Sequence, residues 1–204
     1  MYDIEKTKEL VKSKLINDNP LTGEKRFIHS LGVAEAALEL KRKFYNFLDE
    51  NVVEFTALIH DYCKYEKIDN YKKIITKYNI DEAFFSESEK IYHSVLGCYI
   101  IKDVFKIDDD NIINAIKYHS FGSKNMTPLE EIIYVSDYIE KNRVGIESFN
   151  LIKKYAKVDI KKAVAIESKI LLDYLMTTGE KIYPSAYDTY EGYKKYLEEI
   201  KWIY

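Results

Sequence analysis

The sequence predicts an all-α protein that folds as a single domain. Apolar residues recur at helical spacing along most of the chain, and no segment has the alternating pattern of a strand. Only 7 of the 204 residues are Gly and 3 are Pro, which indicates few turns and long helices. A chain of this length can bury a sizeable core in one domain, and no linker or internal repeat divides it.

We expect about ten helices, five of them in the first half of the chain. The first ends before Pro20, because the residue before a proline is biased away from helical backbone angles. In the second, Phe27, Leu31 and Leu38 keep helical spacing. The fourth is short and polar, so we expect it to be exposed. The expected ranges are 3–17, 22–43, 51–63, 69–78 and 86–105.

The second half begins with a helix that the acidic run Asp108–Asp110 favours through the helix dipole, and that ends near His119. The next helix has the clearest start. Thr127 can cap it, Pro128 fits its first position, and Glu130 completes a capping box. This helix runs to about residue 142. Two longer helices are expected within the C-terminal segment 147–204, at about 159–177 and 185–203.

The bulk composition excludes several classes of partner. The net charge is −3 and Lys and Glu are mixed along the chain, so we expect no broad basic surface for nucleic acid or an anionic membrane. No apolar stretch of about 18 residues and no signal-peptide core are present, which makes the cytoplasm the expected compartment. The oligomeric state stays open, with a homodimer as one alternative.

Chemistry is indicated by titratable residues inside apolar segments. The chain has four histidines, His29, His60, His93 and His119, and the pair His60-Asp61 follows the apolar run VVEFTALI. Another carboxylate, Asp137, lies within IIYVSDYIE. Such groups are costly to bury unless they are paired or bind a metal. A lone histidine is more often a hydrogen-bonded core residue, and a lone Asp can pair with Lys, but the set together predicts a metal site built from separated helices.

The positions of these residues on their helices support one shared site. His29 lies on the same face as Val33 and Leu40, so it is expected to point inward. Adjacent helical residues diverge by about 100°, so His60 and Asp61 reach one site only near a helix end. Gly97, one turn after His93, permits close approach of a ligand or of backbone.

The two cysteines and three arginines give further indications. Cys63 and Cys98 form no CxxC pair or disulfide framework. Cys63 adjoins the His-Asp pair, but a small core residue is the favoured interpretation. Arg26 and Arg143 flank the segments of His29 and Asp137, whereas Arg42 lies outside any motif.

Four segments resemble the HD superfamily of metal-dependent phosphohydrolases and, more narrowly, its YqeK type, the symmetrical diadenosine tetraphosphate hydrolases. They are RFIHSLGVAEAA, ALIHDYCKY, HSVLGCYIIKDVF and AIKYHSFGSKNMTPLEEIIYVSDYIEKNR. Together they cover most of residues 21–143. The last is the most specific, since it joins His119, a glycine loop and the Asp137 helix in one block.

The resemblance implies an HD-domain fold and symmetrical cleavage of dinucleoside tetraphosphates to nucleoside diphosphates such as ADP or GDP. It implies that metal is bound by His29, His60, Asp61 and Asp137. His93 and His119 are placed at a second metal or against the substrate phosphates. The residues expected at the nucleotide are Arg26, Asp61, Lys64, His93, His119, Arg143 and Tyr183. The C-terminal helices in 147–204 are expected to complete the nucleotide pocket.

The resemblance also implies iron, in one or two ions. Mixed imidazole and carboxylate ligands themselves favour iron, manganese or zinc over magnesium.

The chain departs from the family pattern near the nucleotide. Ser123 stands where an arginine is usual, with Lys124 next to it, and Ile182-Tyr183-Pro184 replaces Ile-His-Pro, with no Arg-Asn pair after it. The turn after Arg143 is two residues shorter and reads Val144-Gly145. These departures leave open an HD phosphohydrolase for a mononucleotide or nucleoside triphosphate. A non-catalytic nucleotide-binding module is a third alternative, against which the six ligand-type residues count.

Overall fold

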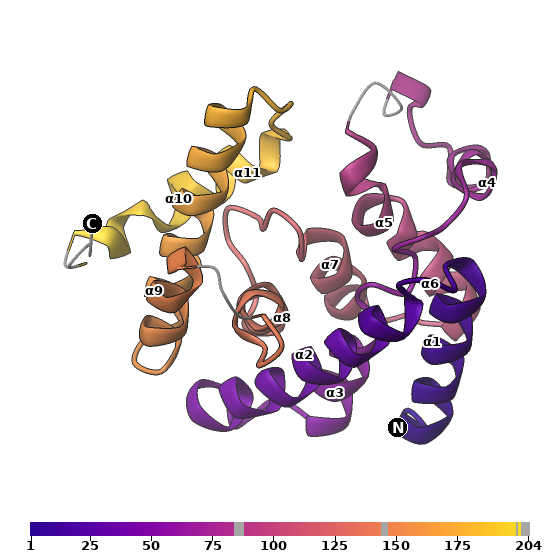
Figure 1. The fold of residues 1–204 in the computed structure, drawn as a ribbon, viewed down its shortest axis with the longest axis horizontal. Coiled ribbons are helices and arrows are strands. Elements are labelled where there is room, and N and C mark those ends of the chain that lie inside the picture. Colours follow the sequence, from indigo (N-terminus) through magenta and orange to yellow (C-terminus); the bar gives the residue numbers. More distant parts are fainter. Residues whose placement is uncertain (84–87, 144–146, 199, 201–204) are drawn as a thin grey trace.

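The computed structural model describes residues 1–83, 88–143, 147–198 and 200, and every regular element in them is helical, as predicted (Figure 1). The N-terminal half holds the helices α1 (Ile4–Asp18), α2 (Gly23–Phe44), α3 (Glu50–Ile59), α4 (Ile68–Tyr78), α5 (Tyr92–Val95) and α6 (Gly97–Phe105). The C-terminal half holds α7 (Asp110–Tyr118), α8 (Pro128–Ile139), α9 (Glu147–Ala156), α10 (Ile160–Thr178) and α11 (Pro184–Tyr193).

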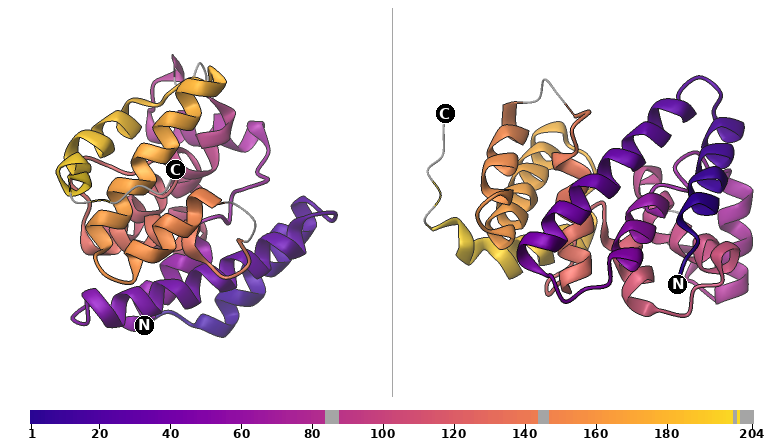
Figure 2. Two further views of the ribbon diagram at one scale, coloured as in Figure 1. Left: turned by 60° about the vertical axis from the view of Figure 1, so that its left-hand side comes forward. Right: turned by 90° about the horizontal axis from the view of Figure 1, so that it is seen from below.

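The centre of the molecule is formed by α2, α3, α7 and α8. The long α2 packs on α1, α3 and α8, while α10 packs on α8, α9 and α11. The C-terminal helices therefore lie at one end of the molecule and α1 at the other, with α2 and α8 between them (Figure 2). This arrangement places α8 between α2 on one side and the C-terminal helices α9 and α10 on the other.

Caps and apolar faces explain why these elements form. Among the described residues, side-chain caps begin five of the α-helices, at Asp3, Asp49, Asp109, Thr127 and Asp159. The predicted capping box of Thr127 and Glu130 is confirmed. The faces that meet at the centre carry apolar side chains with no exposed surface. Burying one such side chain stabilises the fold by about 1.5–3 kcal/mol. Among these side chains are Leu58, Ile59, Ile116, Ile132 and Ile133.

Several predicted boundaries are wrong. The helix expected over 51–63 ends at Ile59. The single helix expected over 86–105 is instead a 3₁₀ turn, Glu89–Ile91, followed by α5 and α6 with a break at Leu96; residues 84–87 lie outside the described part. The last α-helix, expected to reach residue 203, ends at Tyr193 and is followed by a 3₁₀ turn, Lys194–Leu197. Residues 199 and 201–204 lie outside the described part.

Three further expectations can be compared with the structure. Helix α4 is not simply exposed, because Tyr71, Ile74 and Ile75 bury one of its faces. Both cysteines are free and buried, as expected for core residues. Gly97 permits close packing on Cys63 rather than access for a ligand, since a Cβ there would lie 2.8 Å from Cys63 Cβ. No helix among the described residues is long and apolar enough to cross a membrane.

Candidate metal centre

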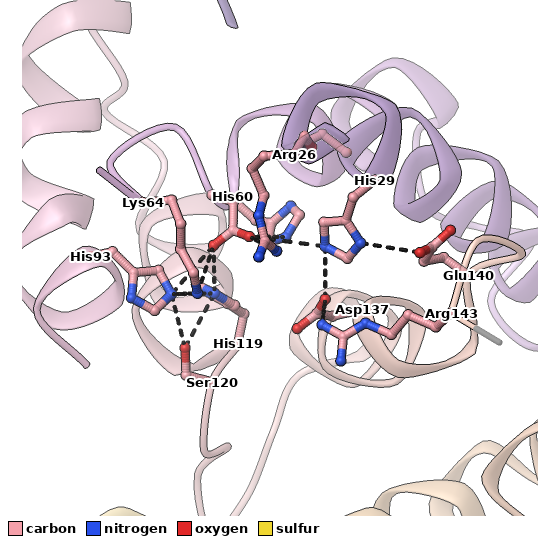
Figure 3. A network of polar contacts seen from close by, with 12 residues as sticks. Arg26, His29, His60, Lys64, His93, His119, Ser120, Asp137, Glu140 and Arg143 are labelled. Atoms are coloured by element: carbon pink, nitrogen blue, oxygen red, sulfur yellow. Dashed lines mark hydrogen bonds and ion pairs between the residues drawn. The ribbon is translucent and has the colours of Figure 1, made fainter. Parts of the chain in front are cut away.

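The six predicted ligand residues come together at the centre of the fold (Figure 3). His29 projects from α2 and Asp137 from the last turns of α8, while His93 lies in the short α5. His60 and His119 occupy the C-caps of α3 and α7, and Asp61 follows in the turn after α3. All six are buried. The prediction that His60 and Asp61 must lie at a helix end is confirmed.

The positions of His60 and His119 fix their tautomers. The Nδ1 atom of His60 lies 2.6 Å from the carbonyl oxygen of Ala57, and Nδ1 of His119 lies 2.6 Å from that of Ile116. A carbonyl oxygen only accepts, so each Nδ1 carries the proton and donates it. The last carbonyls of a helix lack intrahelical partners and are free for this purpose. Each Nε2 therefore presents a lone pair to the centre, as a metal ligand must.

His29 is held from behind by Glu140, which follows α8. Its Nδ1 lies 3.2 Å from Oε1 of Glu140, whose Oε2 accepts from the backbone N–H and Nδ2 of Asn142 at 2.7 and 2.9 Å. Gly32 makes room for this carboxylate, because a Cβ at that position would clash with it. Sequence reasoning missed Glu140. The only signal was its place three residues after Asp137 on the same helical face.

The described residues contain two groups of three ligand-type side chains, and within each group the ligand atoms all lie within 4.8 Å of one another. His60 belongs to both groups. One group is His29, His60 and Asp137; the other is His60, Asp61 and His119. The Nε2 of His29 lies 2.9 Å from Oδ1 of Asp137, without the geometry of a hydrogen bond. Within the described part of the chain, Nε2 of His29, Nε2 of His60 and Oδ1 of Asp61 are buried without a hydrogen-bond partner. Such atoms are costly in a metal-free core, and they fit a bound metal ion.

A second cluster adjoins the first on the side of Asp61. The Nε2 atoms of His93 and His119 are 3.2 Å apart, and they lie 3.3 and 3.6 Å from Oδ1 of Asp61. The hydroxyl of Ser120 lies 3.3 Å from the first Nε2 and 3.2 Å from the second. Asp61 thus stands between the two groups of imidazoles, where one carboxylate can serve two ions. Ser120 was also missed, although it directly follows His119.

The electrostatics of the cluster favour ligation. Burial opposes ionisation of Asp61 and Asp137, but the charge of Lys64 beside Asp61 and that of Arg143 beside Asp137 hold both pKa values well below the usual range. Burial, aided by the Lys64 ammonium, lowers the pKa of His93 to about 4, and burial also lowers the pKa of His119. Near pH 7 these two imidazoles are therefore neutral, with lone pairs available to a metal.

Three basic side chains contact the carboxylates of the cluster. A guanidinium nitrogen of Arg26 donates to Oδ2 of Asp61 at 2.8 Å, and one of Arg143 donates to Oδ1 of Asp137 at 2.7 Å. The ammonium of Lys64 lies 3.5 Å from Oδ1 of Asp61 and 3.0 Å from Nε2 of His93. The third arginine, Arg42, pairs with Glu50 on the exposed surface, away from the site. The two arginines predicted at the nucleotide are thus the two at the cluster.

Recesses in the surface give access to this centre from different sides. The C-terminal recess, of about 260 Å³, is lined among others by His93, Phe121, Asp137, Arg143, Leu171 and Tyr183. The arginine recess, of about 610 Å³, is lined among others by Lys25, Arg26, Ile28, His29, Tyr65 and Arg143. The α4 recess, of about 450 Å³, is lined among others by Lys64, Glu66, Ile68, Glu89, Lys90 and His93. Arg143 lines the first two, so they meet at the cluster.

The departures noted in the sequence lie at the edge of these recesses or beyond them. Tyr183 lines the C-terminal recess, with its ring centroid 4.7 Å from that of Phe121. Ser123 donates to Glu130 at 3.4 Å, and Lys124 is exposed. Neither residue is among those that line the three recesses described above. Val144 and Gly145 lie outside the described residues.

Comparison with known proteins agrees with this site. The family model of the HD domain matches residues 26–142, which include all six ligand-type residues. The chain is 32% identical over 169 residues to the symmetrical bis(5'-nucleosyl)-tetraphosphatase of Bacillus subtilis (strain 168), covering 82% of this chain and 88% of that protein. It is 31% identical over 201 residues to the enzyme of the same name from Staphylococcus aureus (strain NCTC 8325 / PS 47), covering 98% of both.

A solved structure has the same fold. The crystal structure of a Clostridium acetobutylicum protein, described as a predicted HD superfamily hydrolase involved in NAD metabolism, superposes with a TM-score of 0.81 at 27% identity. The superposition covers 96% of this chain and 98% of that one. With the match of the family model and the identity to the two phosphatases, this agreement establishes that the chain belongs to the HD domain family.

Proposed function

We propose that the protein is a metal-dependent phosphohydrolase that cleaves dinucleoside tetraphosphates symmetrically into two nucleoside diphosphates, acting in the cytoplasm. The observation that carries the proposal is the buried cluster of unpartnered ligand atoms, edged by Arg26, Arg143 and Lys64 and open to recesses on its sides. The activity printed in the names of the two phosphatases supports it.

In this proposal His29, His60, Asp61 and Asp137 hold the first metal ion. His93 and His119 hold a second one together with Asp61, because both imidazoles are neutral near pH 7 and face its Oδ1 atom. Iron is the proposed metal, with manganese and zinc as the alternatives that the same ligand types accept. When bound, the metal supplies Lewis acidity, which activates water and offsets charge on the phosphate.

The basic residues of the chain supply the remaining phosphate contacts. Arg26 and Arg143 each hold a ligand carboxylate with one nitrogen, and a guanidinium has further donors that can bind phosphate oxygens. With Lys64 they offset the charge that develops as a water oxygen bonds to phosphorus. The bridging P–O bond between the second and third phosphates breaks and leaves its electron pair on the departing oxygen. One water is consumed, and the products are two nucleoside diphosphates and, when both are fully ionised, two protons.

The C-terminal helices are proposed to complete the nucleoside pocket. Leu171 and Tyr174 of α10 and Tyr183 before α11 face the C-terminal recess together with Phe121 from the α7–α8 loop. Aromatic and aliphatic walls beside charged phosphate contacts suit a nucleoside, whose base is flat and apolar on its faces. The replacement of the usual histidine by Tyr183 keeps a ring at this wall.

Product analysis tests the proposal. The metal-loaded protein is incubated with diadenosine or diguanosine tetraphosphate, and the products are separated by chromatography. Release of ADP or GDP alone is expected, whereas ATP with AMP would contradict symmetrical cleavage. Turnover of mononucleotides or nucleoside triphosphates, with no action on either dinucleotide, would favour the alternative phosphohydrolase activity.

A pair of arginine variants adds a control to this assay. Arg143→Ala removes a charged hydrogen-bond donor that we place at the phosphates, so kcat/KM should fall at least ten-fold for both dinucleotides, since such a bond contributes about 1.5–3 kcal/mol. Arg42→Ala removes an arginine on the exposed surface and should leave kcat/KM unchanged. Equal rates for both variants would remove Arg143 from the phosphate contacts.

A further inference from the structure

A dinucleoside tetraphosphate has two nucleoside halves, and the cluster is open on more than one side. If the C-terminal recess takes one half, the arginine recess and the α4 recess are the two recesses described above that can take the other half. The two differ in charge and in the apolar surface that they offer, and these properties decide between them.

Charge favours the arginine recess. Its lining has three basic residues, Lys25, Arg26 and Arg143, and one acidic residue, Glu140. Both oxygens of Glu140 are already engaged, one by His29 and the other by Asn142. This recess therefore presents a net positive surface to the phosphates of the second half.

The α4 recess lacks this excess of positive charge. Its basic residues Lys64 and Lys90 are matched in number by Glu66 and Glu89. Two basic residues stand against two acidic ones here, compared with three against one in the arginine recess, so this recess is less complementary to a diphosphate.

The arginine recess also has apolar surface suited to a base. Ile28 lies on α2 directly before the ligand His29, and 47% of its surface is exposed. Tyr65 lines the same recess, and its hydroxyl is fixed by the hydroxyl of Thr22 at 2.8 Å. An aromatic ring and an aliphatic side chain beside guanidinium groups form a surface on which a purine can stack, whichever base it carries.

We infer that the arginine recess binds the second nucleoside diphosphate half of the substrate, with its base against Tyr65 and Ile28. Arg143 lines both this recess and the C-terminal recess, so the tetraphosphate crosses the cluster beside it. The inference rests on the proposed cleavage of dinucleoside tetraphosphates. It adds two specificity residues, Ile28 and Tyr65, which lie near the ligand residues in the sequence but have no metal-ligating side chains themselves.

Two substrates that differ only in the second nucleoside test the inference. Diadenosine tetraphosphate has both nucleosides, whereas adenosine 5'-tetraphosphate has one. For Tyr65→Ala and, separately, Ile28→Ala, kcat/KM is measured for each substrate. We expect the ratio of kcat/KM between the dinucleotide and the mononucleotide to fall at least five-fold in Ile28→Ala and ten-fold in Tyr65→Ala. Circular dichroism shows whether each variant is folded. If Tyr65→Ala does not fold, Ile28→Ala alone carries the test.

A matched control comes from the α4 recess. Ile68 is 41% exposed and lines that recess, so Ile68→Ala removes a comparable side chain on the other side of the cluster. It should leave the ratio within two-fold of the wild-type value. A selective fall in Ile68→Ala, or an unchanged ratio in both Tyr65→Ala and Ile28→Ala, would overturn the inference. If the wild type does not cleave the dinucleotide at all, the proposed function itself fails. This outcome is seen with the wild type before any variant is measured, so it is distinguishable from a failure of the inference.

Discussion

Replacing Glu140 by Gln should weaken metal binding although Glu140 is not a proposed ligand. Its two carboxylate oxygens accept from opposite sides, one from His29 and the other from two nitrogens of Asn142. Glutamine has one acceptor oxygen and one NH₂ group, so it cannot serve both sides. If the oxygen stays with Asn142, the NH₂ group faces Nδ1 of His29 and selects the tautomer with the proton on Nε2. That tautomer cannot bind metal through Nε2.

The size of the effect follows from this indirect role. Removing the group that orients a ligating histidine typically lowers metal affinity 10- to 100-fold. That factor corresponds to about 1.4–2.7 kcal/mol of binding free energy. At a free metal concentration about 100 times the wild-type Kd, bound metal stabilises the wild type by about 2.7 kcal/mol, and the variant by only about 0.4–1.4 kcal/mol.

The assay is chelator competition to obtain Kd, with thermal unfolding at the same metal concentration. Glu35→Gln is the matched control, because Glu35 pairs with Lys141 on the exposed surface and does not contact a proposed ligand. It should bind metal as the wild type does. If Glu140→Gln keeps the wild-type Kd while remaining folded, the reasoning about the His29 tautomer is refuted.

Two further outcomes are expected. Burial, reinforced by the negative charge of Asp137, raises the pKa of Glu167 well above its usual value. Above about pH 4.5 the unfolded chain therefore loses a proton that the folded protein keeps. The free energy of unfolding consequently falls as pH rises, by at most about 1.4 kcal/mol per pH unit. Glu167→Gln should therefore raise Tm more at pH 8 than at pH 5, and an equal gain at both would contradict the shift. His119→Ala should keep the ion held by His29, His60 and Asp137 but lose at least ten-fold in kcat, about 1.4 kcal/mol of barrier. A metal-free His119→Ala protein would point to a single shared site.

Much of the fold could be predicted from local signals. The capping box at Thr127 and Glu130 is a sequence pattern with a local cause, and it marks the start of α8 correctly. The break at Leu96 has no such cause. It accompanies the close packing of Gly97 on Cys63, which lies far away in the sequence. The amphipathic character of α4 was similarly hidden, because three buried residues among polar ones are easily read as a solvated helix.

The candidate site shows the same difference between features with a local sequence signal and features that arise from contacts between distant segments. Histidines and carboxylates in apolar segments could be found from the sequence, since burying them requires a compensating partner. Glu140 and Ser120 could not, because each acquires its place only when α8 meets α2, or when α7 meets α5. Tyr65 and Ile28 were also invisible, as one aromatic and one exposed isoleucine carry no signal until the recess between them is known.

The central claim is that the buried cluster holds a transition metal, and the metal content of the purified protein tests it most directly. His60 belongs to both groups of ligand atoms, so His60→Ala should disrupt both. Plasma mass spectrometry should find at least one iron, manganese or zinc ion per chain in the wild type and in Arg42→Ala, and a loss of that metal in His60→Ala. A wild-type protein that is metal-free, and whose thermal stability is unchanged by added iron, manganese or zinc, would contradict the account.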